Sequence, residues 1–105
     1  MAKKRARVER RRRERELDKL GDAREKLARL TEGGAPERPI EVPSASVIEG
    51  HALGLGCARC EGELRLVDHD AVRTEQGPLR RVRAQCKRCR AMREVWLQVV
   101  VHLPS

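Results

Sequence analysis

All four cysteines of the chain stand in two short pairs with the same spacing. Cys57 and Cys60 form the first pair, and Cys86 and Cys89 form the second. A Cys-x-x-Cys turn presents two thiolates to one ion, so two such turns complete a tetrahedral set of four ligands. The pattern predicts one structural Zn²⁺ ion held by these four cysteines, with no open position for a substrate.

The residues alone leave other uses of paired cysteines open. A Cys-x-x-Cys pair can be a redox motif, although neither pair lies in a βαβ pattern. Four thiolates can also hold an iron–sulfur cluster, usually at other spacings, and disulfides form in oxidising compartments. Zinc is the interpretation we favour. Because four thiolates complete the ligand set, we expect the three histidines to lie on the surface: His51, His69 and His102.

The composition explains why such a chain needs a metal ion. It has 105 residues, 38% of them charged, with no Phe or Tyr and with Trp96 as its single aromatic residue. A core without large aromatic side chains buries little area, and small domains of this kind usually need a metal or disulfides. Zinc bound by four thiolates contributes on the order of 10 kcal/mol to folding. We expect one small domain at most.

Several functional classes are not expected from this sequence. No stretch approaches the roughly 20 apolar residues of a membrane span, and no apolar region follows the basic N-terminus as it would in a secretory signal. We therefore expect a cytoplasmic protein, without a membrane partner, in which thiols stay reduced. No paired carboxylates, Ser/His/Asp set or glycine-rich phosphate loop stands out, so we do not expect an enzyme.

Positive charge is concentrated at the N-terminus. Residues 1–15 carry nine Lys or Arg and two Glu, a net charge of +7, whereas residues 16–50 are net −3 and residues 51–105 are net +4. Residues 1–31 are expected to form a basic, amphipathic helical arm, because they are rich in helix formers and lack proline. Its first half has almost no apolar face beyond Val8, so it should fray in solution until its charge is neutralised.

Leucine residues give the second half of this arm an apolar stripe. Leu17, Leu20, Ala23, Leu27 and Leu30 recur at steps of three and four residues. The stripe spans about two heptads, which is short for a coiled coil. It is either a docking site for a partner or a second copy, or part of a marginal helix that folds back on the rest of the chain or stays solvated.

Residues 32–46 are rich in Gly and Pro and are predicted to be a linker, in which Ile40–Val42 form a short extended piece. Residues 47–105 are predicted to form the metal-binding unit. Within it we expect 47–56 to be extended, because three glycines outweigh the capping-box spacing of Ser46 and Glu49. We then expect a strand over 62–67, a polar loop over 69–78, a strand over 79–84 and a strand over 92–103, with Trp96 on the opposite face from Val95 and Leu97.

Residues 57–103 resemble the zinc-ribbon family, on the strength of the two cysteine pairs and the strands that follow them. The resemblance implies a small metal-stapled β fold: a three-stranded antiparallel zinc ribbon, here preceded by an N-terminal basic α-helix. Many ribbon turns carry Gly directly after the second cysteine. Here Glu61 and Arg90 occupy those places and Gly62 comes one residue late. A residue other than Gly adopts the required turn at some cost.

Two functions are expected from these features. The first is binding of RNA or DNA backbone with little sequence specificity, because Trp96 is the only aromatic residue available for stacking. The residues expected to contact it are Lys3, Lys4, Arg5, Arg7, Arg10, Arg11, Arg12, Arg13 and Arg15 on the arm and Arg81, Arg83, Lys87 and Arg88 on the ribbon. The alternative is a protein-interaction adaptor that docks through the Leu17–Leu30 helix, with zinc purely structural.

Basic residues in and beside the cysteine turns have two interpretations. Four thiolates on Zn²⁺ leave a formal charge of −2, which nearby cations would offset. The same cations could instead contact phosphate. The sequence does not choose between these roles for Arg59, Lys87, Arg88 and Arg90.

Overall fold

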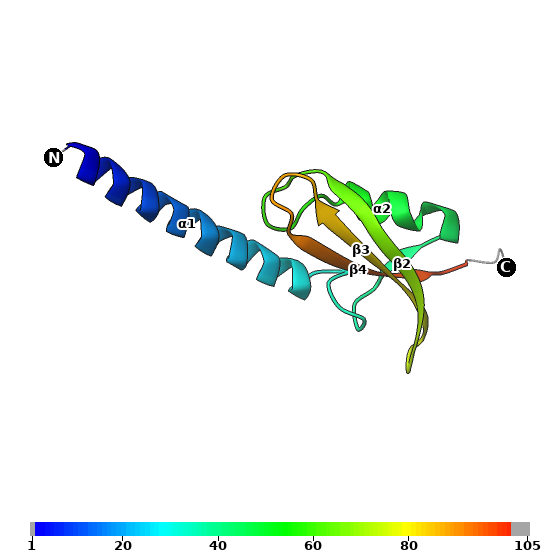
Figure 1. Ribbon diagram of the computed structural model, residues 1–105. Helices are drawn as coiled ribbons and strands as arrows, with labels where there is room; N and C mark the ends of the chain where they lie inside the picture. Colours follow the sequence, from blue (N-terminus) through cyan, green and yellow to red (C-terminus); the bar gives the residue numbers. More distant parts are fainter. Residues whose placement is uncertain (1, 102–105) are drawn as a thin grey trace.

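The computed structural model describes the main chain of residues 2–101. Within that range a long N-terminal helix precedes a four-stranded mixed sheet in the order β1-β4-β3-β2 (Figure 1). The elements in chain order are α1 (Ala2–Leu30), β1 (Ile40–Val42), the 3₁₀ helix η1 (Ala45–Val47), α2 (Ile48–Gly54), β2 (Leu64–Thr74), β3 (Gly77–Cys86) and β4 (Met92–Val99).

Helix α1 confirms the predicted N-terminal helix and runs without a break from its first turn. Its 29 residues make it about 40 Å long, in a molecule whose longest dimension is 74 Å. Residues 3–20 are all exposed, and the first half projects beyond the sheet (Figure 1). The helix ends where the hydroxyl of Thr31 donates to the Ala28 carbonyl and Gly33 adopts a φ of +87°.

The prediction of three antiparallel strands was only partly right. β2–β3 and β3–β4 pair antiparallel, but β1 adds a fourth strand that pairs parallel with β4, with Ile40 opposite Leu97 and Val42 opposite Val99. Ile40 and Val42 are buried while Glu41 is exposed. This alternation gives a three-residue segment enough apolar contact to join the sheet edge.

The predicted polar loop over 69–78 was wrong. Those residues continue the β2–β3 ladder to Thr74 opposite Gly77, and only Glu75 and Gln76 form the turn. The ladder holds because its charges pair across the strands: the guanidinium of Arg83 donates to Asp68 at 2.6 and 2.8 Å, and that of Arg81 donates to Asp70 at 2.8 Å. Cross-strand pairs of opposite charge stabilise an antiparallel sheet.

The prediction of an extended segment over 47–56 was also wrong, because most of it forms α2. Ile48 and Ala52, one helical turn apart, are 0% and 1% exposed and close the core on one face of the sheet. Gly50 and Gly54 each cost about 1 kcal/mol of helix propensity relative to Ala, and both lie on the open side of the helix. Burial of one apolar face outweighs that cost. The core cluster consists of Ile40, Val42, Ile48, Ala52, Val82, Val95 and Leu97.

Two apolar side chains on the opposite face of the sheet are also buried. Leu79 and Trp96 are 1% and 8% exposed, and the guanidinium carbon of Arg81 lies 5.8 Å from the centroid of the Trp96 ring. Trp96 therefore lies on the opposite face from Val95 and Leu97, as the alternation predicts. The predicted end of this strand, including Leu103, lies outside the described residues.

Candidate metal centre

The two cysteine turns are built on the same hydrogen-bond pattern. In the first, the Glu61 N–H donates to the Cys57 carbonyl at 3.0 Å; in the second, the Arg90 N–H donates to the Cys86 carbonyl at 3.0 Å. One N–H inside each turn also donates to the first sulfur, from Arg59 to Cys57 Sγ and from Arg88 to Cys86 Sγ, each at 3.3 Å. Each turn therefore holds the thiol of its first cysteine in place through local main-chain contacts; in the second turn, the Cys89 N–H also donates to Cys86 Sγ at 3.4 Å.

The residue after each second cysteine has a left-handed backbone. Glu61 has a φ of 65° and Arg90 a φ of 66°, a conformation that favours glycine and costs a side-chain-bearing residue about 1 kcal/mol. The expectation that non-glycine residues adopt this turn is confirmed. The neighbouring Gly62 has a different reason to be glycine, because a Cβ there would lie 2.8 Å from Cys86 Sγ and 3.2 Å from Cys60 Sγ.

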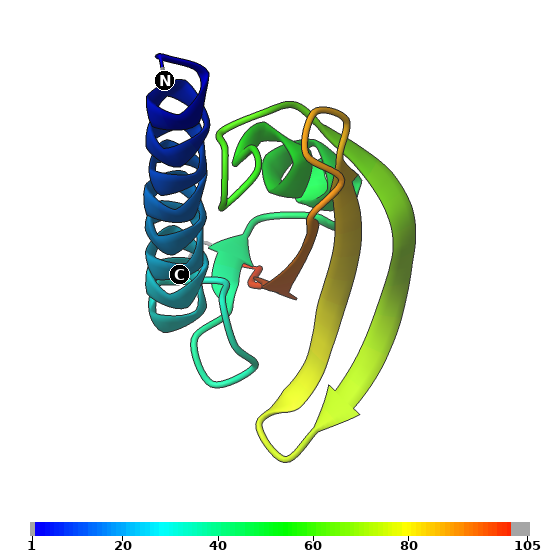
Figure 2. The same ribbon diagram turned by 60° about the vertical axis from the view of Figure 1, so that its left-hand side comes forward.

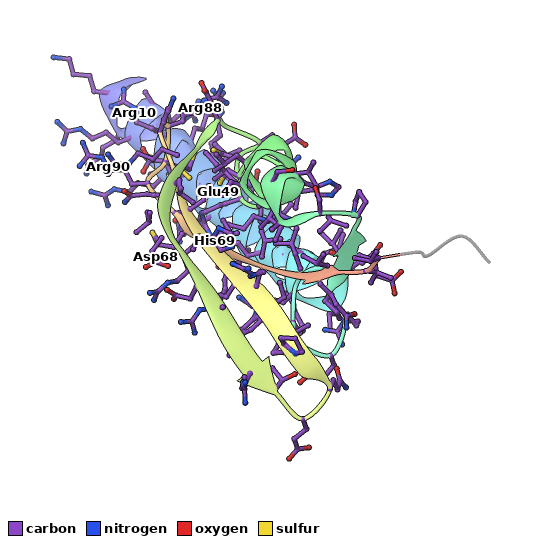
Figure 3. All side chains as sticks on the ribbon, turned by 90° about the vertical axis from the view of Figure 1, so that its right-hand side faces the viewer. Arg10, Glu49, Asp68, His69, Arg88 and Arg90 are labelled. Carbon is purple, nitrogen blue, oxygen red and sulfur yellow. The ribbon has the colours of Figure 1, made fainter. Side chains whose placement is uncertain are left out.

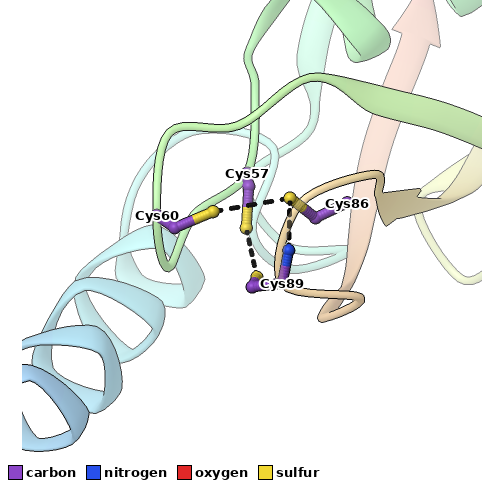
Figure 4. Close-up of side chains that lie close together, drawn as sticks. All are labelled: Cys57, Cys60, Cys86 and Cys89. Atoms are coloured by element: carbon purple, nitrogen blue, oxygen red, sulfur yellow. Dashed lines mark hydrogen bonds between the residues drawn. The ribbon is translucent and has the colours of Figure 1, made fainter. Parts of the chain in front are cut away.

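The four sulfur atoms form one compact cluster (Figure 4). All four Sγ atoms lie within 4.8 Å of one another, with Cys57 Sγ 3.6 Å from Cys89 Sγ and Cys60 Sγ 3.4 Å from Cys86 Sγ. The thiols are free rather than joined in disulfides. The sequence prediction that these cysteines come together is confirmed, and they are positioned to bind a metal ion.

The β2–β3 pairing brings the two turns together. Leu64, at the start of β2, lies opposite Cys86 at the end of β3. Leu64, Ala84, Cys57 and Cys86 form a small buried cluster. Hydrogen bonds from the N–H groups of Cys89 and Arg88 lower the pKa of Cys86 to about 6, below the ordinary thiol value. The site is therefore attached to the sheet rather than carried on a loose loop.

Arg93 is a component of the site that the sequence analysis missed. It lies on β4, half-buried, and donates from Nη1 to the Gly56 carbonyl at 2.8 Å, immediately before Cys57. Burial lowers its pKa and the nearby Cys57 thiol raises it. Its guanidinium is therefore anchored to the main chain immediately before the first cysteine turn. Arg93 is 36 residues from Cys57 in the chain, so only the β4 position reveals the contact.

Arg59 reaches away from the sulfur atoms to helix α1. Its Nη1 donates to Asp22 Oδ1 at 2.6 Å and to Glu25 Oε1 at 3.3 Å, and its Nη2 to Asp18 Oδ1 at 3.2 Å. The hydrogen bond that Arg59 donates to Asp22 is the largest of several effects that raise the pKa of Arg59. The side chain crosses α1 at Gly21, the one buried position among residues 3–30. We call this set the Arg59–α1 contact.

The Arg59–α1 contact joins the first cysteine turn to the arm. Figure 2 shows α1 running alongside the end of the sheet that carries this turn. Near the end of the helix, Arg38 Nη2 also donates to the Arg29 carbonyl at 2.7 Å. Arg59 lies between the two cysteines of the first turn, so its hydrogen bonds connect that turn directly to the helix.

Neither of the two described histidines, His51 and His69, joins the cysteine cluster. His51 is exposed, as expected, whereas His69 was wrongly expected on the surface: its side chain is only 17% exposed, with Nδ1 3.7 Å from Glu49 Oε1 (Figure 3). It lies on the sheet face that α2 covers, opposite Val82 on β3. His102 lies outside the described residues.

The residues expected to bind nucleic acid divide into exposed arm residues and sheet residues that are mostly paired with acids. The nine arm residues are all exposed, and Arg12 pairs with Glu16 at 3.6 Å. On the sheet, Arg81 and Arg83 pair with aspartates of β2, and Lys87 pairs with Glu63 at 3.0 Å. Arg88 is exposed, with no acidic partner among the described residues, and in Figure 3 it projects on the same side as Arg10 and Arg90.

Comparisons with protein-family models, with curated proteins and with solved structures found no match to this chain. The fold and site define a small protein with an N-terminal helix, a mixed sheet and a four-cysteine cluster that could hold a metal ion, consistent with a zinc-binding ribbon. Between Ala2 and Val101, no helix is long and apolar enough to cross a membrane.

Proposed function

We propose that this protein is a structural-zinc ribbon protein that binds the phosphate backbone of nucleic acid through residues 3–15 of α1. The observation that carries the proposal is the arm itself. Nine cations, all exposed, stand on a helix that projects beyond the sheet. A helix with this charge density binds a polyanion by releasing its counterions.

The ligand chemistry supports zinc as the metal. Four thiolates in two Cys-x-x-Cys turns are a set that Zn²⁺ binds in a tetrahedron with Zn–S distances of about 2.3 Å, which separates the sulfurs by about 3.8 Å. The sulfur separations of 3.4 and 3.6 Å between the turns are close to that value. Zinc saturated by four thiolates has no open position, so its role is to hold the two turns together.

The surroundings of the arm favour contacts to backbone over contacts to bases. Stacking on single strands needs exposed aromatic side chains, and Trp96 is buried within the sheet. Basic side chains surround the arm rather than lining one face, which suits phosphates on both sides of a groove. The ribbon adds Arg88 and Arg90, while Arg81, Arg83 and Lys87 already have acidic partners.

Fluorescence anisotropy with a generic labelled duplex, as DNA and as RNA, tests the proposal on the metal-loaded protein. If the arm neutralises about four phosphates, affinity should fall roughly 100-fold between about 50 and 200 mM salt. Replacing Arg10, Arg11, Arg12 and Arg13 together by Gln should remove most of this binding and flatten the salt dependence.

A matched variant keeps the test specific to residues 3–15. Replacing Lys19, Arg24, Lys26 and Arg29 by Gln removes the same charge from the same helix but leaves residues 3–15 intact. This variant should retain most of the affinity. Equal losses in the two variants, or no measurable binding by the unmodified protein, would contradict the proposal.

A further inference from the structure

Helix α1 contacts the sheet with one face and leaves its leucines on another. The positions that the fold covers are Gly21, which is buried, and Glu25 and Ala28, which are half-buried. Leu20, Leu27 and Leu30 remain 48%, 62% and 62% exposed. We call Leu20, Ala23, Leu27 and Leu30 the leucine face. No described residue of this chain covers it.

The charges along both edges of the leucine face are cationic, and one acid, Glu16, lies at its N-terminal end, where it pairs with Arg12. At 3.6 residues per turn, Lys19 and Lys26 lie along one edge of this face and Arg24 along the other. None of the three has an acidic partner within salt-bridge distance among residues 2–101. The other nearby acids lie toward the sheet: Asp18, Asp22 and Glu25 are held by Arg59.

The Arg59–α1 contact therefore separates acidic and basic residues onto different sides of the helix. It gathers three carboxylates toward the first cysteine turn and leaves an apolar strip with cationic edges open to solvent. Such a strip fits a helix with apolar residues on one face and carboxylates on the flanks of that face. A second copy of this chain does not fit, because its own Lys19, Arg24 and Lys26 would lie against those of the first copy.

We propose that the leucine face is a docking surface for an acidic amphipathic helix of a partner protein. The leucines bury the apolar face of that helix, and its flanking carboxylates pair with Lys19, Arg24 and Lys26. The surface is separate from residues 3–15, and the proposal does not depend on nucleic-acid binding.

The test uses the full-length, metal-loaded protein and three designed helical peptides, with anisotropy as the readout. The first peptide has Leu on one face and Glu on both flanks. The second keeps the Glu flanks but has Ala in place of Leu, and the third keeps Leu but has Lys flanks. We expect the first to bind, the second to bind at least tenfold more weakly, and the third not to bind.

Variants of the protein locate the surface. Leu27→Gln, at an exposed position that leaves the fold intact, should weaken the first peptide at least tenfold. Val8→Gln, at a position that is also exposed but lies within residues 3–15, outside the leucine face, should leave the affinity for the first peptide unchanged. Replacing Arg10, Arg11, Arg12 and Arg13 by Gln should affect nucleic-acid binding and leave the first peptide bound, which separates this proposal from the function proposed above.

Two results would overturn the proposal. Equal affinity for the two Glu-flanked peptides would mean that the helix attracts any polyanion and that the leucines do not contribute. Sedimentation of the unmodified protein as a dimer that Leu27→Gln dissociates would make a second copy the occupant of this face.

Discussion

The substitution Gly21→Ala should have opposite effects on the intrinsic stability of helix α1 and on the Arg59–α1 contact. In an exposed helix interior, Gly→Ala stabilises by about 1 kcal/mol. In this protein, a Cβ at Gly21 would lie 2.8 Å from both Cγ and Cζ of Arg59. Real Cβ atoms do not approach other atoms so closely, so the Arg59 side chain must shift, and we expect the shift to weaken its hydrogen bonds to Asp18, Asp22 and Glu25.

The structure predicts that Gly21→Ala lowers the amide protection of α1 when Arg59 is present and raises it when Arg59 is absent. In the unmodified protein, Gly21→Ala should lower the protection of the α1 amides around residues 17–30, because the Arg59–α1 contact is lost. In an Arg59→Ala background the space beside Gly21 is free, so Gly21→Ala should stabilise the helix by the usual difference in helix propensity between Ala and Gly. A gain of about 1 kcal/mol is roughly a fivefold rise in protection.

Hydrogen exchange read by mass spectrometry measures the amide protection of residues 17–30 in zinc-loaded protein. The experiment compares all four combinations of Gly21→Ala and Arg59→Ala. Peptide 1–31 alone supplies the control, since there Gly21→Ala should raise helicity measured by circular dichroism. If Gly21→Ala raises protection equally with and without Arg59, then Arg59 does not hold α1 in the way described here.

Other predictions concern the cysteine cluster and the hairpin. Native mass spectrometry should find one zinc ion per chain, and a chelator or Cys57→Ser should unfold the ribbon, because structural zinc contributes on the order of 10 kcal/mol; a folded, metal-free protein would contradict this. Gly62→Ala should weaken zinc binding in a competition assay, because its Cβ would crowd two sulfurs, whereas Gly50→Ala, which has open space in α2, should leave it unchanged. The pKa of Asp68 is lowered, chiefly by its hydrogen bonds from Arg83, so its stabilising contribution is present above the ordinary carboxyl pKa and is lost as pH falls through the lowered value. A carboxyl NMR titration should show this depression in the unmodified protein and its disappearance in Arg83→Gln; an unchanged titration would refute the assignment.

The parts of the fold that were predicted correctly depend on neighbours close in the chain. Two residues between two cysteines define a turn with both thiols on one side, whatever the rest of the chain does. The long helix follows from a proline-free run of helix formers. The alternation that separates Trp96 from Val95 and Leu97 follows from the strand period of two.

The errors share one cause, which is that distant residues decided the outcome. Residues 69–78 are polar enough for a loop, but Asp68 and Asp70 meet arginines of β3 and continue the ladder. The glycines of α2 oppose a helix, but Ile48 and Ala52 have a sheet to pack on. The parallel pairing of β1 with β4 joins segments more than 50 residues apart.

The paired cysteines by themselves determined two turns whose thiols can face one ion, and the N-terminal run determined a basic helix, because both depend on spacing within one or two turns of chain. Only the tertiary structure decided which basic side chains have acidic or main-chain partners. It joins Arg93 to the Gly56 carbonyl, pairs Arg81 and Arg83 with aspartates, and turns Arg59 toward α1. These contacts join residues far apart in the chain, so they follow from the pairing of strands and the docking of the helix.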